Sequence, residues 1–458
     1  MNLFGKKVSH VWASLGPRFL PFADVATPDL PLGRLLRLSL FQVSVGMALV
    51  LLVGTLNRVM IVEMGVPASL VAIMVALPLI FAPFRALIGF RSDTHRSALG
   101  WKRVPFIWKG TLLQFGGFAV MPFALLVLAG MGQAGKAPAW VGQFGAAIAF
   151  LLVGAGIHIT QTVGLALATD LVPQESQPKV VGLMYVMLLL GMMVSALVFG
   201  VILSEFSPGR LIQVIQGVAL TTLILNVISL WKQEPRDREA IHRPKQDHRF
   251  SDSWRMFCQG GHATRRLLAV GLGTMAFTME DILLEPYGGE ILNLSVGATT
   301  SLTATLAIGG LLGFGLASQI LGRGADPFRM ATAGAWVGVP AFVLVILAAP
   351  LAAPLLFVLG ILLIGFGAGL FGHGTLTATM NLAPQNQRGL ALGAWGAVQA
   401  TAAGAGMALG GVIRDLVAMF AGVYSGYMVV YSIEIILLFA TLIAMAPLIR
   451  RKGQAVTI

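Results

Sequence analysis

Residues 168–177 read ATDLVPQESQ and residues 379–387 read TMNLAPQNQ, so a similar segment occurs twice in the chain. The same offset aligns three glycines of the first half with three of the second: Gly154 with Gly365, Gly156 with Gly367, and Gly182 with Gly393. Each copy of the segment follows a long apolar run. The chain therefore contains an internal repeat, which predicts two similar halves.

The composition predicts that these halves lie in a lipid bilayer. Of the 458 residues, 57% are hydrophobic and only 11% are charged, and the mean hydropathy is +0.84. Soluble globular proteins carry about 25% charged residues, so this surface is not suited to water. Apolar stretches of about 20 residues, long enough to cross a bilayer core, recur along the chain. The sequence therefore predicts an all-α polytopic membrane protein.

Charged residues separate the apolar runs into twelve predicted transmembrane helices. These lie near residues 35–63, 66–90, 105–130, 141–170, 179–204, 210–232, 263–289, 296–321, 328–350, 353–381, 388–413 and 424–449. The helices form two six-helix bundles, at 35–232 and 263–450, joined by a basic linker at 233–262. An amphipathic segment at 1–34 precedes them, and a short tail at 451–458 follows.

The basic residues predict how the chain is oriented. They gather before the first helix, after the second, in the linker and at the end of the chain, whereas the loops of the opposite side offer little beyond Lys136 and Arg210. The positive-inside rule then places both termini and the linker in the cytoplasm. These loops also account for the net charge of +12, so we expect anionic lipid headgroups, not nucleic acid, beside them.

Two six-helix halves with a parallel repeat and a basic cytoplasmic linker are the plan of the major facilitator superfamily. The ends of helices 1 and 7 extend the repeat, because residues 57–63 read NRVMIVE and residues 279–285 read MEDILLE. We therefore expect the major facilitator superfamily fold, with twelve transmembrane helices in two six-helix halves.

Enzymatic motifs are absent from the sequence. It contains no phosphate-binding G-x-x-x-x-G-K-[ST], no zinc-binding H-E-x-x-H and no G-x-S-x-G nucleophile motif. Cys258 is the single cysteine, which excludes a disulfide within the chain and argues against a thiolate metal site. The sequence predicts a protein that is not an enzyme and has no bound metal ion of its own.

Ionisable side chains inside a membrane are costly, so each one is a candidate for function. The predicted helices contain eight: Arg58, Arg85, His158, Glu280, Asp281, Glu285, His373 and Glu434. Six of the eight fall on helices 1, 4, 7 and 10, which line the central cavity of a facilitator fold. The pattern indicates an interior that holds a ligand or a charge network.

Arg58 and the pair Glu280 and Asp281 lie at equivalent depths of the two halves. We expect an ion pair across the halves, which could serve a ligand or act only as a structural contact. Asp281 and Glu285 are four residues apart and share a helix face, unless both reach the aqueous boundary beyond Pro286. Arg85, near the predicted cytoplasmic end of helix 2, is expected to extend to the interface.

His158 and His373 lie in helices 4 and 10 among glycines and threonines. A neutral imidazole at such a position can ligate the magnesium of a chlorin ring, relay protons, or hydrogen-bond a neighbouring threonine. Glu434 lies in helix 12, which usually faces outward in this fold. Its carboxyl would be protonated, paired with a neighbouring helix, or turned to a partner protein or a pigment.

Four strings resemble one family. Residues 35–46 read LLRLSLFQVSVG, 55–63 read TLNRVMIVE, 84–101 read FRALIGFRSDTHRSALGW, and 280–289 read EDILLEPYGG. They are similar to the PucC/LhaA family, and the resemblance covers nearly the whole chain. It implies a facilitator-fold protein of purple phototrophic bacteria that serves the assembly of light-harvesting antenna complexes.

The resemblance also implies a ligand and partners. Members are thought to handle bacteriochlorophyll, so we expect bacteriochlorophyll a as a transiently bound cofactor, with His158 or His373 as its magnesium ligand. The partners would be light-harvesting antenna polypeptides and pigment-synthesis enzymes. The location would be the inner membrane, cytoplasmic or intracytoplasmic.

The loop between helices 2 and 3 departs from the solute facilitators, which read roughly G-x-x-x-D-R-x-G-R-R there. This chain has a cytoplasmic loop motif of Gly89, Arg91, Asp93 and Arg96 that keeps only the glycine and the aspartate in register. The loop helps to gate alternating access, so its divergence argues against transport. A proton-coupled transporter of a small solute, with Arg58 and the acidic pair as coupling groups, stays as the alternative. A pigment-synthesis enzyme subunit would need an acidic cluster that the sequence lacks.

Overall fold

The computed structural model describes residues 31–81, 85, 88, 91–92, 101–130, 133, 136–173, 176–234, 263–382 and 388–449. The regular structure within these residues is helical throughout. The segment 1–30, most of the linker (235–262) and the tail from residue 450 onward lie outside the described residues. The predicted orientation of the chain in the membrane stays a prediction.

The helices of the N-terminal half follow the predicted order. They are α2 (Leu32–Leu38), α3 (Leu40–Leu49), η2 (Val50–Leu56), η3 (Val59–Glu63), α4 (Ala68–Ala76), η4 (Leu77–Phe81), α6 (Val104–Leu128), α7 (Ala139–Asp170), α8 (Gln177–Ile202) and α9 (Pro208–Leu230). The first four form one continuous span, in which η2 and η3 have wider π-helical turns.

The helices of the C-terminal half also follow the predicted order. They are α11 (Ala263–Thr278), η7 (Glu280–Ile282), α12 (Leu284–Glu290), α13 (Val296–Gly322), α14 (Pro327–Ala348), α15 (Pro354–Leu382), α16 (Arg388–Ala421), α17 (Val423–Met445) and η9 (Ala446–Leu448). Among the described residues, eleven helices are long and apolar enough to span a membrane, and the shorter helix Ala68–Leu79 lies where the second span is predicted. These eleven helices and the shorter one account for the twelve predicted spans.

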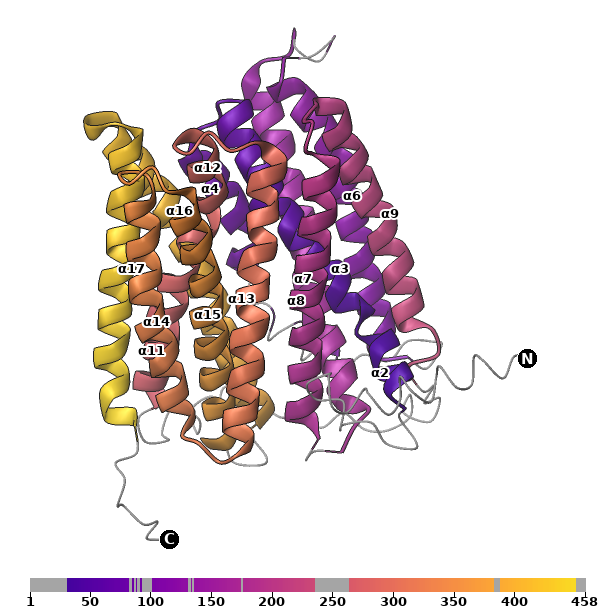
Figure 1. Ribbon diagram of the computed structural model, residues 1–458. Coiled ribbons are helices and arrows are strands. Elements are labelled where there is room, and N and C mark those ends of the chain that lie inside the picture. The colour runs from indigo at the N-terminus through magenta and orange to yellow at the C-terminus, as the bar shows by residue number, and fades with distance from the viewer. Residues whose placement is uncertain are drawn as a thin grey trace, which may run out of the picture.

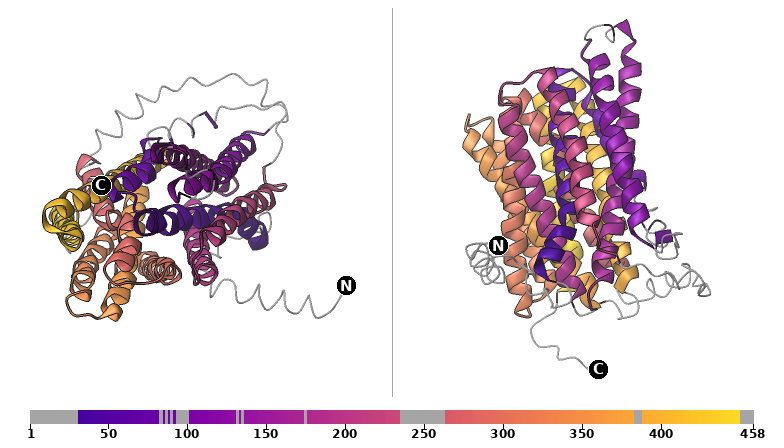
Figure 2. Two further views of the ribbon diagram at one scale, coloured as in Figure 1. Left: turned by 90° about the horizontal axis from the view of Figure 1, so that it is seen from above. Right: turned by 90° about the vertical axis from the view of Figure 1, so that its right-hand side faces the viewer.

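The two halves lie side by side, the first in indigo to magenta and the second in salmon to yellow (Figures 1 and 2). Helices α8 and α13 join them on one side, and α4 and α16 on the other. Gly200 and Gly297 let α8 and α13 meet closely, because a Cβ on Gly297 would lie 2.5 Å from the Gly200 carbonyl oxygen. Small residues at a helix crossing allow such close approach in lipid.

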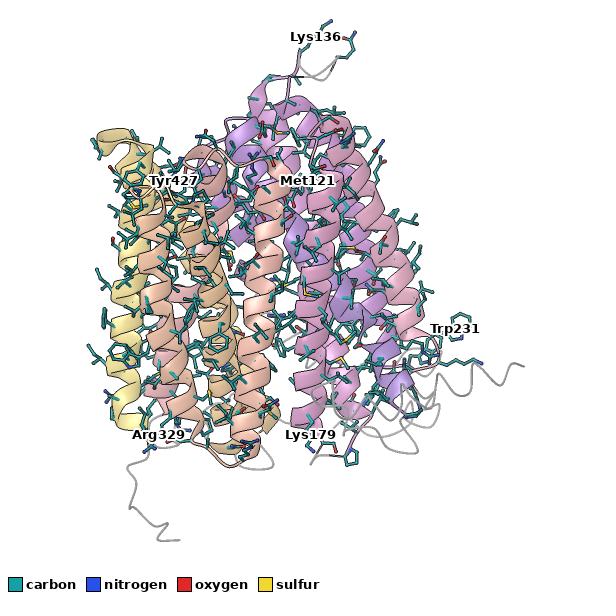
Figure 3. All side chains as sticks on the ribbon, viewed as in Figure 1. Met121, Lys136, Lys179, Trp231, Arg329 and Tyr427 are labelled. Atoms are coloured by element: carbon teal, nitrogen blue, oxygen red, sulfur yellow. The ribbon has the colours of Figure 1, made fainter. Side chains whose placement is uncertain are left out.

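Among the described residues, polar contacts between the halves gather toward one end of the bundle, which Lys136 and Tyr427 mark in Figure 3. We call this the Lys136 end, and the opposite end, near Lys179 and Arg329, the Lys179 end. Asn57 Nδ2 donates to the Ile282 carbonyl at 2.7 Å, and the Ser69 backbone N–H donates to Asp415 Oδ2 at 2.7 Å. The bundle is therefore fastened at the Lys136 end.

The seventh span is broken, although the sequence predicts a continuous helix over residues 263–289. A 3₁₀ turn at Glu280–Ile282 separates α11 from α12. Pro286 has no N–H, so it cannot donate to the Ile282 carbonyl four residues before it. Asn57 of the other half satisfies that carbonyl instead. The proline therefore creates an acceptor that joins the two halves.

Glu234, at the end of the N-terminal half, caps the start of helix α6, which lies far from it in the sequence. The Glu234 carboxylate, just after α9, accepts backbone N–H groups of Lys102 at 2.7 Å and of Arg103 and Val104 at 2.9 Å. These groups form the start of α6, where unpaired N–H donors and the helix dipole favour an anion.

Replacing Glu234 with alanine is therefore expected to lower the free energy of unfolding by about 1 kcal/mol, the usual cost of losing a helix cap. Thermal unfolding of the purified protein in mild detergent would measure it. Glu205→Ala is the control, because Glu205 is 81% exposed and forms a surface ion pair with Arg210. Equal midpoints for the two variants would contradict the capping role.

Candidate functional site

A cavity of about 1420 Å³, a volume that includes the space at its opening, lies between the two halves. It is lined mostly by leucine, valine, isoleucine, methionine and alanine side chains from both halves. The polar side chains in its lining are Arg85, His158, Gln161, Gln399, Asp281, Glu285, Thr274, Thr278 and Thr303. We call it the central cavity. Ligand pockets are mostly apolar with a few polar groups, so the lining of the central cavity suits an apolar ligand.

A second cavity of about 1010 Å³ adjoins the first. The two share lining residues, among them Met192, Asp281 and Gln399. The second cavity extends between α8, α13 and α15, past Tyr185 and Phe314. A ligand in the central cavity could therefore extend toward the crossing of α8 and α13.

His158 lies on the cavity face of α7, the helix that also carries Gln161 and Thr162 three and four residues later. The side chain lines the central cavity and is only 8% exposed. Its Nδ1 is buried and finds no hydrogen-bond partner among the described residues. The threonine hydrogen bond expected as one alternative is therefore not observed among the described residues.

Arg85 approaches the same face of α7. Its Nε donates to Thr162 Oγ1 at 3.1 Å, and its Nη2 donates to Gln161 Oε1. The guanidinium lines the central cavity. The prediction that Arg85 extends to the membrane interface is therefore wrong, because polar groups of α7 offer it hydrogen bonds inside the bundle.

The opposite wall of the cavity is acidic. Glu285 and Asp281 both line it, as their shared helix face predicts. Glu285 is 3% exposed, and its carboxylate accepts from Thr303 Oγ1 at 2.5 Å and from Thr300 Oγ1 at 3.4 Å. It packs against Gly54, where any Cβ would meet the Glu285 carboxylate. The cavity thus has basic groups on one half and acidic groups on the other.

Arg58 does not form the predicted ion pair with Glu280 or Asp281. It pairs with Glu63 of its own span, and its Nη2 donates to the Leu294 carbonyl of the other half at 3.0 Å. The π-helical turns of η3 explain this choice, because residues five apart come together in such turns. Arg58 joins the halves through a backbone carbonyl instead of a carboxylate.

Glu280 and Glu434 lie inside the C-terminal half. Both are fully buried, and their carboxyl oxygens have no hydrogen-bond partner among the described residues. Glu434 therefore points into the bundle and not toward its outer surface, where residues of helix 12 of this fold usually point. The face of α17 that carries Tyr427, Tyr431 and Glu434 packs inward, and Tyr287 meets both tyrosine rings at 5.2 and 5.5 Å between centroids.

His373 is buried in α15, with its ring 4.2 Å from that of Phe314. It is not among the described residues that line the central cavity. Gly89, Asp93 and Arg96 of the cytoplasmic loop motif lie outside the described residues, and Arg91 is exposed. Among the described residues, no group of three or more His, Cys, Asp or Glu side chains could hold a metal ion.

Comparison with known proteins identifies the chain. The family model described as "PUCC protein" matches residues 55–453. Protein PucC of Rhodovulum sulfidophilum is 63% identical over 91% of this chain and 92% of its own length. The chain belongs to the PucC family.

Other relatives have different names or lower identity. Protein PucC of Cereibacter sphaeroides is 58% identical over 97% of this chain and 98% of its own length. The "Bacteriochlorophyll synthase 44.5 kDa chain" of Rhodobacter capsulatus is 27% identical over 92% of this chain and 96% of its own length. The PucC family resemblance predicted from the four strings is confirmed.

Solved structures relate this PucC-family chain to the transporters of the major facilitator superfamily. A D-xylose-proton symporter superposes with a TM-score of 0.69, at 14% identity, over 89% of this chain and 96% of that one. Such a low identity establishes the fold alone. The predicted facilitator fold is confirmed, and the chain is a multi-pass membrane protein.

Proposed function

We propose that this chain is an assembly factor for photosynthetic light-harvesting antenna complexes. It holds bacteriochlorophyll in the central cavity and delivers it to antenna polypeptides in the inner membrane. Membership of the PucC family and the apolar lining of the cavity support this. A pigment with a long hydrocarbon tail enters from the bilayer, so a cavity between helices suits it better than an aqueous channel.

One observation carries the proposal, the position of His158. It is a buried imidazole in the cavity wall, without a hydrogen-bond partner on Nδ1 among the described residues. A neutral imidazole is a common metal ligand, and the magnesium of a chlorin ring accepts one. His158 would therefore hold the pigment, because the magnesium would accept a nitrogen of its imidazole as a ligand. The apolar walls would exclude water from the pigment.

The test is pigment content. Protein purified in mild detergent from a phototrophic host is expected to contain about one bacteriochlorophyll per chain, seen by absorption and extraction, with small antenna polypeptides that identify the antenna served. His158→Phe is expected to remove most of the pigment. His373→Phe is the matched control, because His373 is not among the described residues that line the central cavity, and it should keep the pigment. Unchanged pigment in His158→Phe would exclude that ligand.

A proton-coupled transporter of a small solute is the second candidate. Asp281 and Glu285 on the cavity wall favour it, whereas Arg58, a proposed coupling group, is paired with Glu63. It predicts pH-dependent counterflow in proteoliposomes. A colourless, partner-free protein that shows counterflow would favour transport over pigment delivery.

A further inference from the structure

Arg85 is partly buried and differs from the fully buried arginines among the described residues. Arg58, Arg103 and Arg414 are each less than a tenth exposed, and each pairs with a carboxylate. The hydrogen-bond partners of Arg85 among the described residues are neutral, the Thr162 hydroxyl and the Gln161 side-chain carbonyl. Among the described residues it forms no ion pair.

A charge without a counter-charge is costly inside a membrane protein. A guanidinium has five N–H donors, and the hydrogen bonds to Thr162 and Gln161 use its Nε and one N–H of Nη2. The remaining donors belong to a side chain that lines the central cavity. They are therefore placed to meet a ligand.

The acidic wall of the cavity does not supply the missing anion. Glu285 is held by Thr303 and Thr300 on its own half and packs against Gly54. Asp281 lies on the same half, in the lining that the two cavities share.

We propose that Arg85 is an anion-binding site and that the central cavity recognises an amphipathic carboxylate, a large apolar body with one free acid group. This inference rests on the pigment-binding function above and adds a second ligand to it: beside the esterified pigment that is delivered, the cavity binds, and binds more tightly, a magnesium tetrapyrrole whose propionate is not esterified. A long-chain fatty acid offers the same chemistry from the lipid phase. Arginine matches the two oxygens of a carboxylate with paired N–H donors.

The position of Arg85 relative to His158 suits a tetrapyrrole acid. Gln161 and Thr162, which hold the guanidinium, follow His158 on α7 by about one helical turn, or about 5.4 Å. One wall therefore offers an imidazole for the metal and a cation for an acid group on the rim of the ring. An esterified propionate would receive only the weaker hydrogen bonds of a neutral carbonyl.

The test uses two matched ligand pairs. The purified protein is titrated with the free acid and the methyl ester of the same magnesium tetrapyrrole, which differ by one charge, and binding is followed by absorption. Palmitic acid and methyl palmitate are then used as competitors or as radiolabelled ligands. The variants are Arg85→Gln, Arg85→Lys and, as a control, Arg91→Gln, which removes an exposed charge close in sequence.

Wild type is expected to bind the acid at least about tenfold more tightly than the ester, the size of one hydrogen bond to a charged group. Arg85→Gln should lose this preference while its affinity for the ester stays within about twofold, which also shows that the variant is folded. Arg85→Lys should regain part of the preference, because the charge returns without the paired donors. Arg91→Gln should behave as wild type.

The outcomes separate the anion site from the pigment function. Equal binding of tetrapyrrole acid and ester by wild type would overturn the anion site and leave pigment binding intact. No binding of either tetrapyrrole, with an Arg85-dependent preference for palmitic acid, would support the anion site with a lipid source and overturn pigment delivery. The anion site would be overturned if none of the four ligands binds. It would also be overturned if Arg85→Gln loses affinity for the acid and for the ester to the same extent.

Discussion

Arg414→Met is expected to lower the free energy of unfolding by about 3 kcal/mol, the usual cost of removing one partner of a buried ion pair. Arg414 is 7% exposed, pairs with Glu290, and donates to Asp415 Oδ1 at 2.7 Å. Its guanidinium also lies 4.9 Å from the centre of the Tyr427 ring. Methionine would fill a similar volume but would leave two carboxylates without their cation.

The loss should extend to the contact between the halves, because Asp415 also accepts the Ser69 N–H from α4. Unfolding in a detergent titration would measure the stability. Cross-linking of cysteines placed on α4 and α16 at the Lys136 end would measure the contact. Arg210→Met is the control, since Arg210 and Glu205 form an exposed pair worth less than about 1 kcal/mol. A similar small effect in both variants would show that the Arg414 network does not hold this end together.

Gly365→Ala is the second substitution with a large expected effect. A Cβ at residue 365 would lie 2.1 Å from the Leu306 carbonyl oxygen of α13. Backbone atoms cannot move aside as a flexible side chain does, so α13 and α15 would have to separate. We expect a loss of about 2 kcal/mol, the range found for overpacking, and less folded protein in the membrane.

Gly372→Ala in the same helix is the matched control. No heavy atom lies within 4 Å of its added Cβ, and alanine favours a helix over glycine by about 1 kcal/mol. Its thermal midpoint should therefore stay the same or rise while that of Gly365→Ala falls. A fall of equal size in both variants would mean that glycine flexibility, not close packing, determines the stability of α15.

The helices were predictable from the sequence because the bilayer imposes length and composition on each span. The broken seventh span was not, since hydropathy does not register the turn at Glu280–Ile282. Pro286 was the signal for it, because it removes the N–H that a continuous helix needs. The wider turns of η2 and η3 carry no comparable signal in an apolar run, so the Arg58–Glu63 pair was missed.

The sequence predicted which types of residue form the site better than it predicted which side chains each of them contacts. The sequence selects His158 and His373 equally, and the packing of the halves decides that His158 lines the cavity. Arg85 stands beside a basic loop, so its sequence context fits a lipid-facing arginine and a cavity-facing one alike. The inward face of α17 had a signal, because Tyr427, Tyr431 and Glu434 recur at i, i+4 and i+7.

The π-helical turns of the first span determine the direction in which the side chains that follow them point. An i→i+5 ring holds one residue more than an α-helical ring, so each widened turn absorbs a residue, as a single insertion would. Every side chain beyond it is rotated by about 100°, the angle per residue of an α-helix. Asn57, Arg58 and Glu63 all lie beyond η2. Deleting one residue between Val50 and Leu56 would therefore let a widened turn close to an α-helical one and keep these groups facing their partners, whereas the same residues in an unbroken α-helix would turn them away.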